Sequence, residues 1–171
     1  AIYYADILNK DPRKVEVILS DSRKVVRYFK HERQNEGTMI CEHKLGFISA
    51  NAGVDESNVA GRDNVLLLPK NPDISAKKIM NFFKKKYNTD IGLVITDTFG
   101  RPWRVGQVNV AIGVSGIPVT KSEKGTEDSF GNFMKVTEPA FCDEIAAASG
   151  LVIKKSSKTP IVLFRGLEWV N

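Results

Sequence analysis

Apolar positions along the chain follow two spacings, one typical of helices and the other typical of strands. After Asp11 and Pro12, a favourable helix start, apolar residues recur at helical spacing up to Phe29. Helices are therefore expected over residues 11–29, 75–87 and 137–152, and residues 2–10 read as the end of a further helix. In the second helix Ser75 is the expected cap, and the expected inward side chains are Ile79, Met80, Phe82 and Phe83.

Short apolar or alternating runs predict the strands, which are expected over residues 39–48, 64–68, 91–96, 108–114 and 161–164. Gly46 is expected to bend the first of them, and the polar residues 31–37 are expected to form a loop. Helices and strands interleave without repeats, which indicates a single domain of α+β or mixed α/β class. The chain begins within a helical pattern and without Met, which indicates that an upstream segment is missing.

Composition narrows the class of protein without identifying it. The 171 residues are 42% hydrophobic and 26% charged, which is typical of a folded domain and excludes a disordered chain. The net charge of +5 favours anionic partners. Cys41 and Cys142 lie far apart without CxxC spacing, so they are expected to be reduced thiols of a cytoplasmic protein. No apolar run approaches the length of a membrane span.

The most informative segment follows the apolar run that ends near Thr96. It places Asp97, Thr98, Arg101 and Arg104 close together at the expected end of a buried strand. A carboxylate suits a divalent cation, and guanidinium groups suit phosphate or carboxylate. Two interpretations remain open: a functional site, or an Asp–Arg ion pair that closes a strand–loop corner.

The loop of residues 51–58 is the second candidate. Asp55 is a possible metal ligand, and Ser57 and Asn58, with backbone N–H groups, are candidates to hold phosphate or a base edge. The alternative is a turn in which these side chains satisfy their own backbone. If Asp55 lies beside Asp97, the two carboxylates suit one divalent cation.

Basic residues gather in two further places. Lys77, Lys78 and residues 84–86 form one helix face, which is either a solvated surface or an RNA contact. Lys154, together with Lys155 and Lys158, follows the third expected helix and either receives phosphate oxygens or lies in a solvated loop.

Several motifs taken together resemble one family, the coenzyme F420-0:L-glutamate ligases, across residues 45–167. The matching motifs are Asn51–Val59, Thr96–Arg104, Gln107, Ala111–Gly116, Asp128 with Gly131, Val136–Thr137, Asp143–Ala146 and Arg165–Leu167. Their order and spacing both agree with the family, which makes the resemblance specific. The expected fold is therefore a mixed-sheet α+β domain of the F420-0:gamma-glutamyl ligase type over residues 1–171, comprising the central and C-terminal part of the family fold.

The resemblance also implies an activity and a set of partners. Such an enzyme adds L-glutamate in γ linkage to the deazaflavin precursor F420-0, using GTP, Mg²⁺ or Mn²⁺, and K⁺ as a further candidate ion. The expected intermediate is an acyl phosphate, formed when the γ-phosphate of GTP moves to the terminal carboxylate of the precursor. The resemblance implies an intertwined homodimer. From the cysteines and the lack of a long apolar run, the expected location is the cytoplasm and no membrane partner is expected, and nucleic acid is not the favoured partner.

Site residues are assigned partly by position and partly by chemistry. By position, Asp55, Asp97 and Thr98 correspond to metal ligands, and Asn58 corresponds to a nucleotide contact. From their chemistry, Ser57 and Lys154 are added as nucleotide contacts, and Arg101 and Arg104 as catalytic residues that steady phosphate or the acidic substrate. The site residues are therefore Arg101, Arg104, Asp55, Asp97, Thr98, Asn58, Ser57 and Lys154.

Two departures from the family keep alternatives open. The N-terminal region that supplies nucleotide-binding segments is not matched, and residues 153–159 contain no glycine or acid where the family tends to have a glycine-containing loop. The chain alone is therefore expected to be a poor ligase. One alternative is a relative that binds metal and nucleotide without ligase activity. The other is an RNA-binding module, whose affinity would fall steeply with salt.

Overall fold

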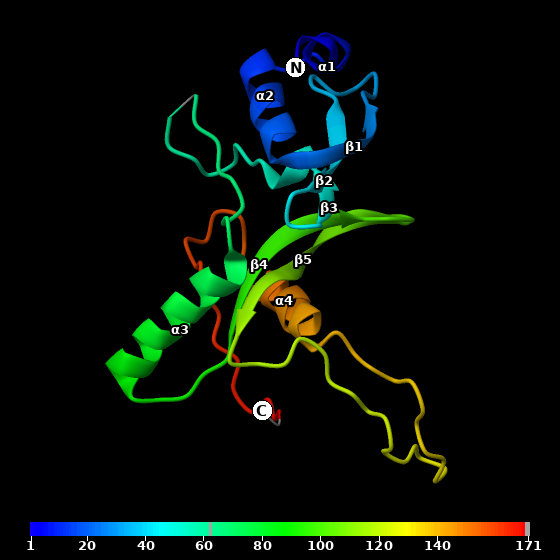
Figure 1. Cartoon of the computed structure of the whole chain (residues 1–171), viewed down its shortest axis with the longest axis vertical. Helices are drawn as coiled ribbons and strands as arrows, with labels where there is room; N and C mark the ends of the chain where they lie inside the picture. The colour runs from blue at the N-terminus through cyan, green and yellow to red at the C-terminus, as the bar shows by residue number, and fades with distance from the viewer. Residues whose placement is uncertain (62, 170–171) are drawn as a thin grey trace. The chain divides into compact units, whose positions relative to one another are not determined.

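The computed structural model of the protein describes residues 1–61 and 63–169, which form two compact units of α+β class. Unit 1 spans Ala1–Leu68 and unit 2 spans Pro69–Asn171. The predicted α+β class is confirmed, and each unit has its own small antiparallel sheet (Figure 1). No helix in the described ranges is both long enough and apolar enough to cross a bilayer.

Unit 1 packs two helices against a three-stranded sheet. Its elements are α1 (Ile2–Leu8), α2 (Pro12–Asp21), β1 (Ser22–Phe29), β2 (Thr38–His43), β3 (Ile48–Ala50) and the short 3-10 helix η1 (Asn51–Gly53). The strand order is β1-β2-β3, with both pairs antiparallel. The centre of the core consists of Leu8, Val15, Ile18, Met39 and Cys41, all with 0% exposure. Apolar residues from both helices and β2 therefore hold this unit together.

The predicted start of α2 is confirmed, but its predicted length is wrong. The side chain of Asp11 accepts a hydrogen bond from the backbone N–H of Arg13, and Pro12 occupies the first turn. The helix ends at Asp21, and Ser22 adopts an extended conformation from which β1 runs to Phe29. Branched and aromatic residues in this stretch favour a strand, and pairing with β2 satisfies its backbone.

The other predictions for unit 1 are partly confirmed. The single strand predicted over residues 39–48 is instead two strands, β2 and β3, and Gly46, with a φ of 94°, lies in the turn between them. Residues 31–37 form the expected loop. The strand predicted over residues 64–68 is wrong: Leu66 makes a single bridge to Asp55, and Leu66 is 54% exposed.

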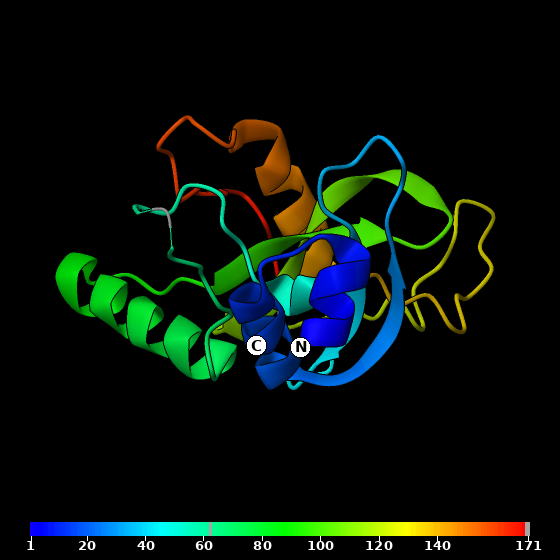
Figure 2. The ribbon, with the colours of Figure 1, turned by 90° about the horizontal axis from the view of Figure 1, so that it is seen from above.

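Unit 2 consists of one long β-hairpin and two helices that flank it (Figure 2). Its elements are α3 (Pro72–Tyr87), β4 (Leu93–Arg101), β5 (Arg104–Ser115) and α4 (Phe141–Val152). Gly113 allows close packing, because a Cβ there would lie 2.5 Å from the backbone carbonyl carbon of Pro72. Gly150 of α4 similarly faces Asn109 of β5, at 3.2 Å from an added Cβ to Nδ2.

Both predicted helices of unit 2 exist, with corrected starts and faces. Asn71 caps α3 by accepting from the N–H of Ile74, so the predicted Ser75 cap is wrong. Met80 and Phe83 are half-buried, but Ile79 and Phe82 are exposed, contrary to the prediction. Helix α4 begins at Phe141 rather than at residue 137. The backbone groups of Thr137 and Pro139 instead accept hydrogen bonds from residues 123 and 121.

The strands of unit 2 differ from the prediction mainly at their ends. The predicted strands over residues 91–96 and 108–114 exist, but β4 begins at Leu93 and continues through the polar segment to Arg101, and β5 begins at Arg104. The strand predicted over residues 161–164 is wrong, since that stretch is irregular. As expected, Cys41 and Cys142 are free thiols, and both are buried.

Candidate functional site

Asp55 organises the loop of unit 1 that carries three predicted site residues. Its backbone exchanges hydrogen bonds with Leu66, at 3.1 and 2.8 Å. Its carboxylate accepts from the N–H of Ser57 at 2.9 Å and from the Ser57 hydroxyl at 2.6 Å. This is the turn proposed as the structural alternative. Carboxylate oxygens are also the ligands that hard divalent cations prefer, so the turn and a metal site use the same group of Asp55.

The chain enters this loop through an unusual backbone conformation. Asn51, Ala52 and Gly53 all have positive φ, of 52°, 52° and 72°, and Asn58 follows with 55°. Left-handed conformations cost energy for residues other than glycine, and they persist where surrounding structure enforces them. Here Ala52 is buried, and the N–H of Val54 bonds to the carbonyl of Asn51. The loop therefore starts from a fixed position.

A network of ion pairs also contacts this loop, and no sequence motif predicts it. The ammonium of Lys14 lies 2.6 Å from Oε2 of Glu56 and 3.0 Å from Oε2 of Glu36. Lys10 also reaches Glu36, at 2.9 Å. Burial acts to raise the pKa of Glu36, but the two lysines outweigh it and the pKa is lowered. Only the fold brings these residues together, from positions 10, 14, 36 and 56.

In unit 2, Asp97 and Thr98 lie in the middle of β4 rather than at a strand end. They pair with Val110 and Asn109, within a regular register from Thr96 to Gly100. Side chains alternate along a strand, so those of Asp97 and Thr98 lie on opposite faces of the hairpin. The two side chains therefore cannot ligate one ion together.

The hydroxyl of Thr98 belongs to a polar chain that reaches α4. It donates to Oδ1 of Asn109 at 2.8 Å, and Nδ2 of Asn109 lies 3.5 Å from the hydroxyl of Ser149. Ser149 in turn donates to the carbonyl of Ala146 at 2.6 Å. These bonds fix the Thr98 side chain against α4.

The backbone carbonyl of Thr98 points in a different direction from the Thr98 side chain. The N–H of Ala111, which pairs with Thr96, bonds to the carboxylate of Asp143 at 2.8 Å, so it points away from β4. Hydrogen-bonded and non-hydrogen-bonded pairs alternate in an antiparallel ladder. The pair of Thr98 and Asn109, two positions along, is therefore of the same kind, and the carbonyl of Thr98 points away from β5. That carbonyl remains a possible ligand beside the carboxylate of Asp97.

Arg101 and Arg104 face each other across the end of the hairpin. They form the last residue pair, and Arg101 donates through Nη2 to the carbonyl of Val105 at 3.2 Å. Between them Trp103 has a φ of 59° and is 100% exposed. A positive φ is uncommon for a bulky residue, and it accompanies a tight turn here. The structure thus brings the two predicted catalytic guanidinium groups to one end of unit 2.

Lys154 lies just after α4 in a tight turn. Its carbonyl accepts from the N–H and the hydroxyl of Ser157, at 3.3 and 3.1 Å, and its side chain is exposed. On α3, Lys84 pairs with Asp90, and the ammonium of Lys86 lies 5.5–5.6 Å from the ring centroids of Tyr87 and Phe82. Part of the basic helix face is therefore engaged within unit 2.

The predicted site residues divide between the units. Unit 1 holds Asp55, Ser57 and Asn58, and unit 2 holds Asp97, Thr98, Arg101, Arg104 and Lys154. Across residues 1–61 and 63–169, no group of at least three His, Cys, Asp or Glu side chains is arranged to hold a metal. Magnesium is commonly held by one or two carboxylates together with substrate phosphates, a donor set that does not need such a group.

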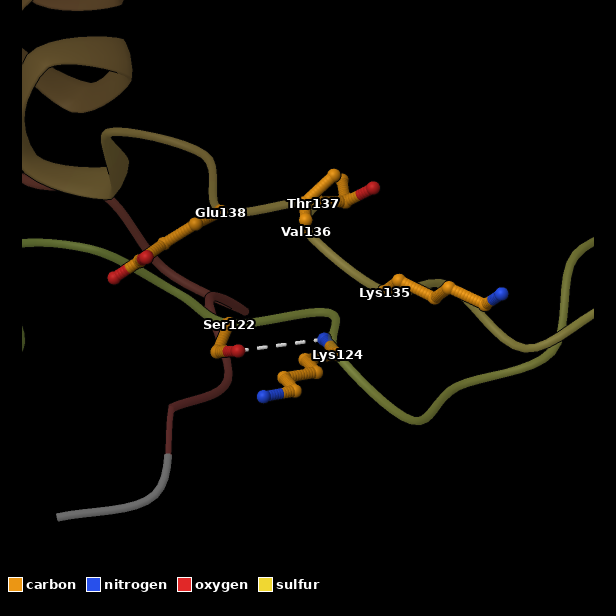
Figure 3. Close-up of a pocket in the computed structure, with 6 residues that line it drawn as sticks. All are labelled: Ser122, Lys124, Lys135, Val136, Thr137 and Glu138. Atoms are coloured by element: carbon orange, nitrogen blue, oxygen red, sulfur yellow. Dashed lines mark hydrogen bonds between the residues drawn. The ribbon is translucent and has the colours of Figure 1, made fainter.

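A surface hollow of about 270 Å³ lies outside these positions, on the segment between β5 and α4 (Figure 3). Six residues line it: Ser122, Lys124, Lys135, Val136, Thr137 and Glu138. The figure shows the side chain of Lys135 directed away from that of Lys124. None of the predicted site residues lines the hollow.

Comparison with known proteins shows which family this chain is similar to. The family model described as F420-0:Gamma-glutamyl ligase matches residues 1–166. The chain is 41% identical over 167 residues to a protein of Methanocaldococcus jannaschii named coenzyme F420:L-glutamate ligase, covering 97% of the chain and 64% of that protein. It is 42% identical over 165 residues to the protein of the same name from Methanopyrus kandleri, covering 96% of the chain and 63% of that protein.

The chain therefore spans a little less than two thirds of the length of these curated relatives. The match begins at residue 1 and includes every predicted site residue. On this evidence, the chain belongs to the F420-0:gamma-glutamyl ligase family.

Proposed function

We propose that this chain serves a ligase that uses GTP and Mg²⁺ or Mn²⁺ to add L-glutamate in γ linkage to F420-0. The observation that carries the proposal is the family match over residues 1–166, together with about 40% identity to relatives named coenzyme F420:L-glutamate ligase. Amide formation from a carboxylate requires activation. The γ-phosphate of GTP would move to the precursor carboxylate, and the glutamate amine would then attack the acyl phosphate and release phosphate.

The chemistry of the residues supports a division of roles. The carboxylates of Asp55 and Asp97 suit a divalent cation. We assign the carbonyl of Thr98 as a further ligand, because its hydroxyl donates to Asn109. The cation would neutralise charge on the transferred phosphoryl group. Asn58, Ser57 and Lys154 would contact the nucleotide.

Arg101 and Arg104 suit the acidic partners of the reaction. Guanidinium groups bind carboxylate and phosphate in a planar, bidentate manner. Their position at one end of the β4–β5 hairpin leaves both side chains exposed. We assign them to the phosphate groups or to the carboxylates of F420-0 and glutamate.

A homodimer is part of the proposal. Trp103, Val105, Phe130 and Val136 of unit 2 are each at least 90% exposed. Large apolar side chains that are this exposed are candidates for burial in an interface between proteins. A second copy of the chain would cover such residues.

The direct test measures Mn²⁺-dependent GTP binding by calorimetry and turnover with F420-0, glutamate and GTP. The variant Asp55→Asn should weaken binding of Mn²⁺–GTP by about tenfold or more, because a charged ligand is lost. Asp90→Asn, which changes an exposed carboxylate paired with Lys84, is the matched control and should bind normally. Absence of nucleotide binding in the unaltered protein, or equal binding by Asp55→Asn, would reject the proposed site.

A further inference from the structure

The ion-pair network of unit 1 lies next to the predicted metal and nucleotide loop. Its four members are Lys10, Lys14, Glu36 and Glu56. Glu56 is the residue between Asp55, a proposed metal ligand, and Ser57, a proposed nucleotide contact. Any force that fixes the Glu56 side chain therefore also restricts the two residues beside it.

The two lysines of the network are largely buried. The side chains of Lys10 and Lys14 are only 2% and 9% exposed. Lys14 projects from α2, whose start is fixed by Asp11 and Pro12. A buried ammonium is costly unless it is paired, so Lys14 strongly favours conformations in which both carboxylates stay within reach.

Glu36 is held in place independently of the loop. The N–H of Gly37 donates to the carbonyl of Leu8 at 2.7 Å, and the side chain of Asn9 donates to the carbonyl of Asn35 at 2.9 Å. These bonds tie the segment around Glu36 to the end of α1. Glu56 is thus the one member of the network that lies in the candidate loop.

We propose that Lys14, supported by Glu36 and Lys10, is a positioning residue that holds the Asp55–Asn58 loop in its binding conformation through Glu56. This inference rests on the proposed function of the loop and adds residues that touch neither metal nor nucleotide. Residues that orient a metal ligand without binding the metal typically change the metal affinity by about 10–100-fold when they are mutated.

The chain offers a matched control within the same loop region. Asp63 also pairs with α2, through Arg13 at 2.9 Å, but both of these side chains are 74% exposed. Glu56→Gln and Asp63→Asn each replace one carboxylate with an amide and change the net charge equally. They differ in that only Glu56 adjoins Asp55 and contacts a buried lysine.

The experiment measures binding of Mn²⁺–GTP and the thermal unfolding of both variants. Glu56→Gln should remain folded and lose about tenfold in affinity, whereas Asp63→Asn should bind normally. Lys14→Met should show the same loss, and Lys14→Arg should restore most of it. Normal affinity in Glu56→Gln, or an equal loss in Asp63→Asn, would overturn the proposal.

Amide hydrogen exchange separates this inference from the proposed function. Without any ligand, Glu56→Gln should speed exchange at Ser57 and Leu66, whose N–H groups bond to Asp55, and leave Gly37 unchanged. If the unaltered protein fails to bind Mn²⁺–GTP, the proposed function fails, yet faster exchange still supports the positioning role. Unchanged exchange at Ser57 and Leu66 would overturn it.

Discussion

Asp97 and Thr98 are neighbours in sequence, but the strand directs their side chains to opposite faces of the β4–β5 hairpin. The sequence motif suggests that both side chains belong to one site, whereas the alternation of side chains along β4 separates them. At the scale of single residues, the structure thus distinguishes roles that the motif alone combines. The two positions accordingly have opposite expected phenotypes.

Asp97→Asn should reduce metal-dependent binding, which Thr98→Val should leave intact. The amide keeps the size of the side chain but removes a charge whose attraction to a divalent ion at ligand distance is several kcal/mol at an effective dielectric constant of about 20. Affinity for Mn²⁺–GTP is expected to fall about tenfold or more. Calorimetry and thermal unfolding, with and without Mn²⁺–GTP, measure this loss.

Thr98→Val is the matched comparison and should show the reverse. It keeps the backbone carbonyl and the shape, but removes the hydroxyl that donates to Asn109. The free energy of unfolding should fall by about 1–3 kcal/mol, because Asn109 loses a partner. Affinity for Mn²⁺–GTP should stay within about twofold of the unaltered protein. A large loss of affinity would show that the hydroxyl itself is a ligand.

His43 predicts a pH dependence confined to unit 1. Burial lowers its pKa, against the attraction of Asp21 and with the help of Lys44 and Arg23. Its Nδ1 accepts from the N–H of Leu45 at 2.9 Å, which requires an unprotonated nitrogen. The unfolded chain therefore takes up the proton first, at about pH 6.5.

The stability from His43 is consequently full above about pH 6.5 and is lost as the pH falls through the lowered pKa. Urea unfolding of the protein between about pH 5 and 8 measures this slope. His43→Asn retains an acceptor for Leu45 but does not titrate, so it should flatten the slope. The same slope in both proteins would exclude His43 as its source.

At the scale of elements, close packing of α3 on β5 depends on Gly113. A methyl group at this position would lie 2.5 Å from backbone atoms of Pro72, which cannot move aside as a flexible side chain could. Gly113→Ala should therefore destabilise the protein by about 1–3 kcal/mol. Gly100→Ala in β4 is the control, because nothing lies within 4 Å of the added group. Equal unfolding midpoints for the two variants would contradict this packing.

Elements with local signals could be predicted from the sequence. Asp11 with Pro12 marks the start of α2, and the apolar runs after residues 90 and 107 mark β4 and β5. The stretch of residues 22–29 could not, because its apolar residues fit both helical spacing and strand alternation. Its pairing with β2, from Phe29 opposite Thr38 to Ser22 opposite His43, decides the outcome.

In the candidate site too, residues with a local sequence signal could be predicted, whereas contacts between distant residues could not. Asp55, Asp97 and their neighbours stand out because their motifs are compact in sequence and match a family. Lys14 and Glu56 do not, since 42 residues separate them and ordinary surface lysines and glutamates look identical in a sequence. The polar chain from Thr98 to Ser149 likewise depends on α4 lying against the hairpin. Contacts between distant residues therefore required the structure.

At the scale of the whole molecule, association is the main prediction. Exposed Trp103, Val105, Phe130 and Val136 should be covered in a homodimer. Light scattering at micromolar concentration should give about twice the chain mass of 19.0 kDa. A monomer at that concentration would contradict the prediction.

The buried thiols have a practical consequence for labelling the protein. Cys41 in unit 1 and Cys142 in unit 2 have 0% exposure, and burial raises the pKa of each thiol. Maleimides react with the exposed thiolate, so both native cysteines should stay unmodified in the folded protein. Cysteines introduced at exposed helical positions, such as Glu16 of α2 and Lys85 of α3, would then accept a donor and an acceptor fluorophore. Energy transfer between these dyes would report whether the distance between the labelled positions changes when Mn²⁺–GTP binds, without any need to remove the natural cysteines.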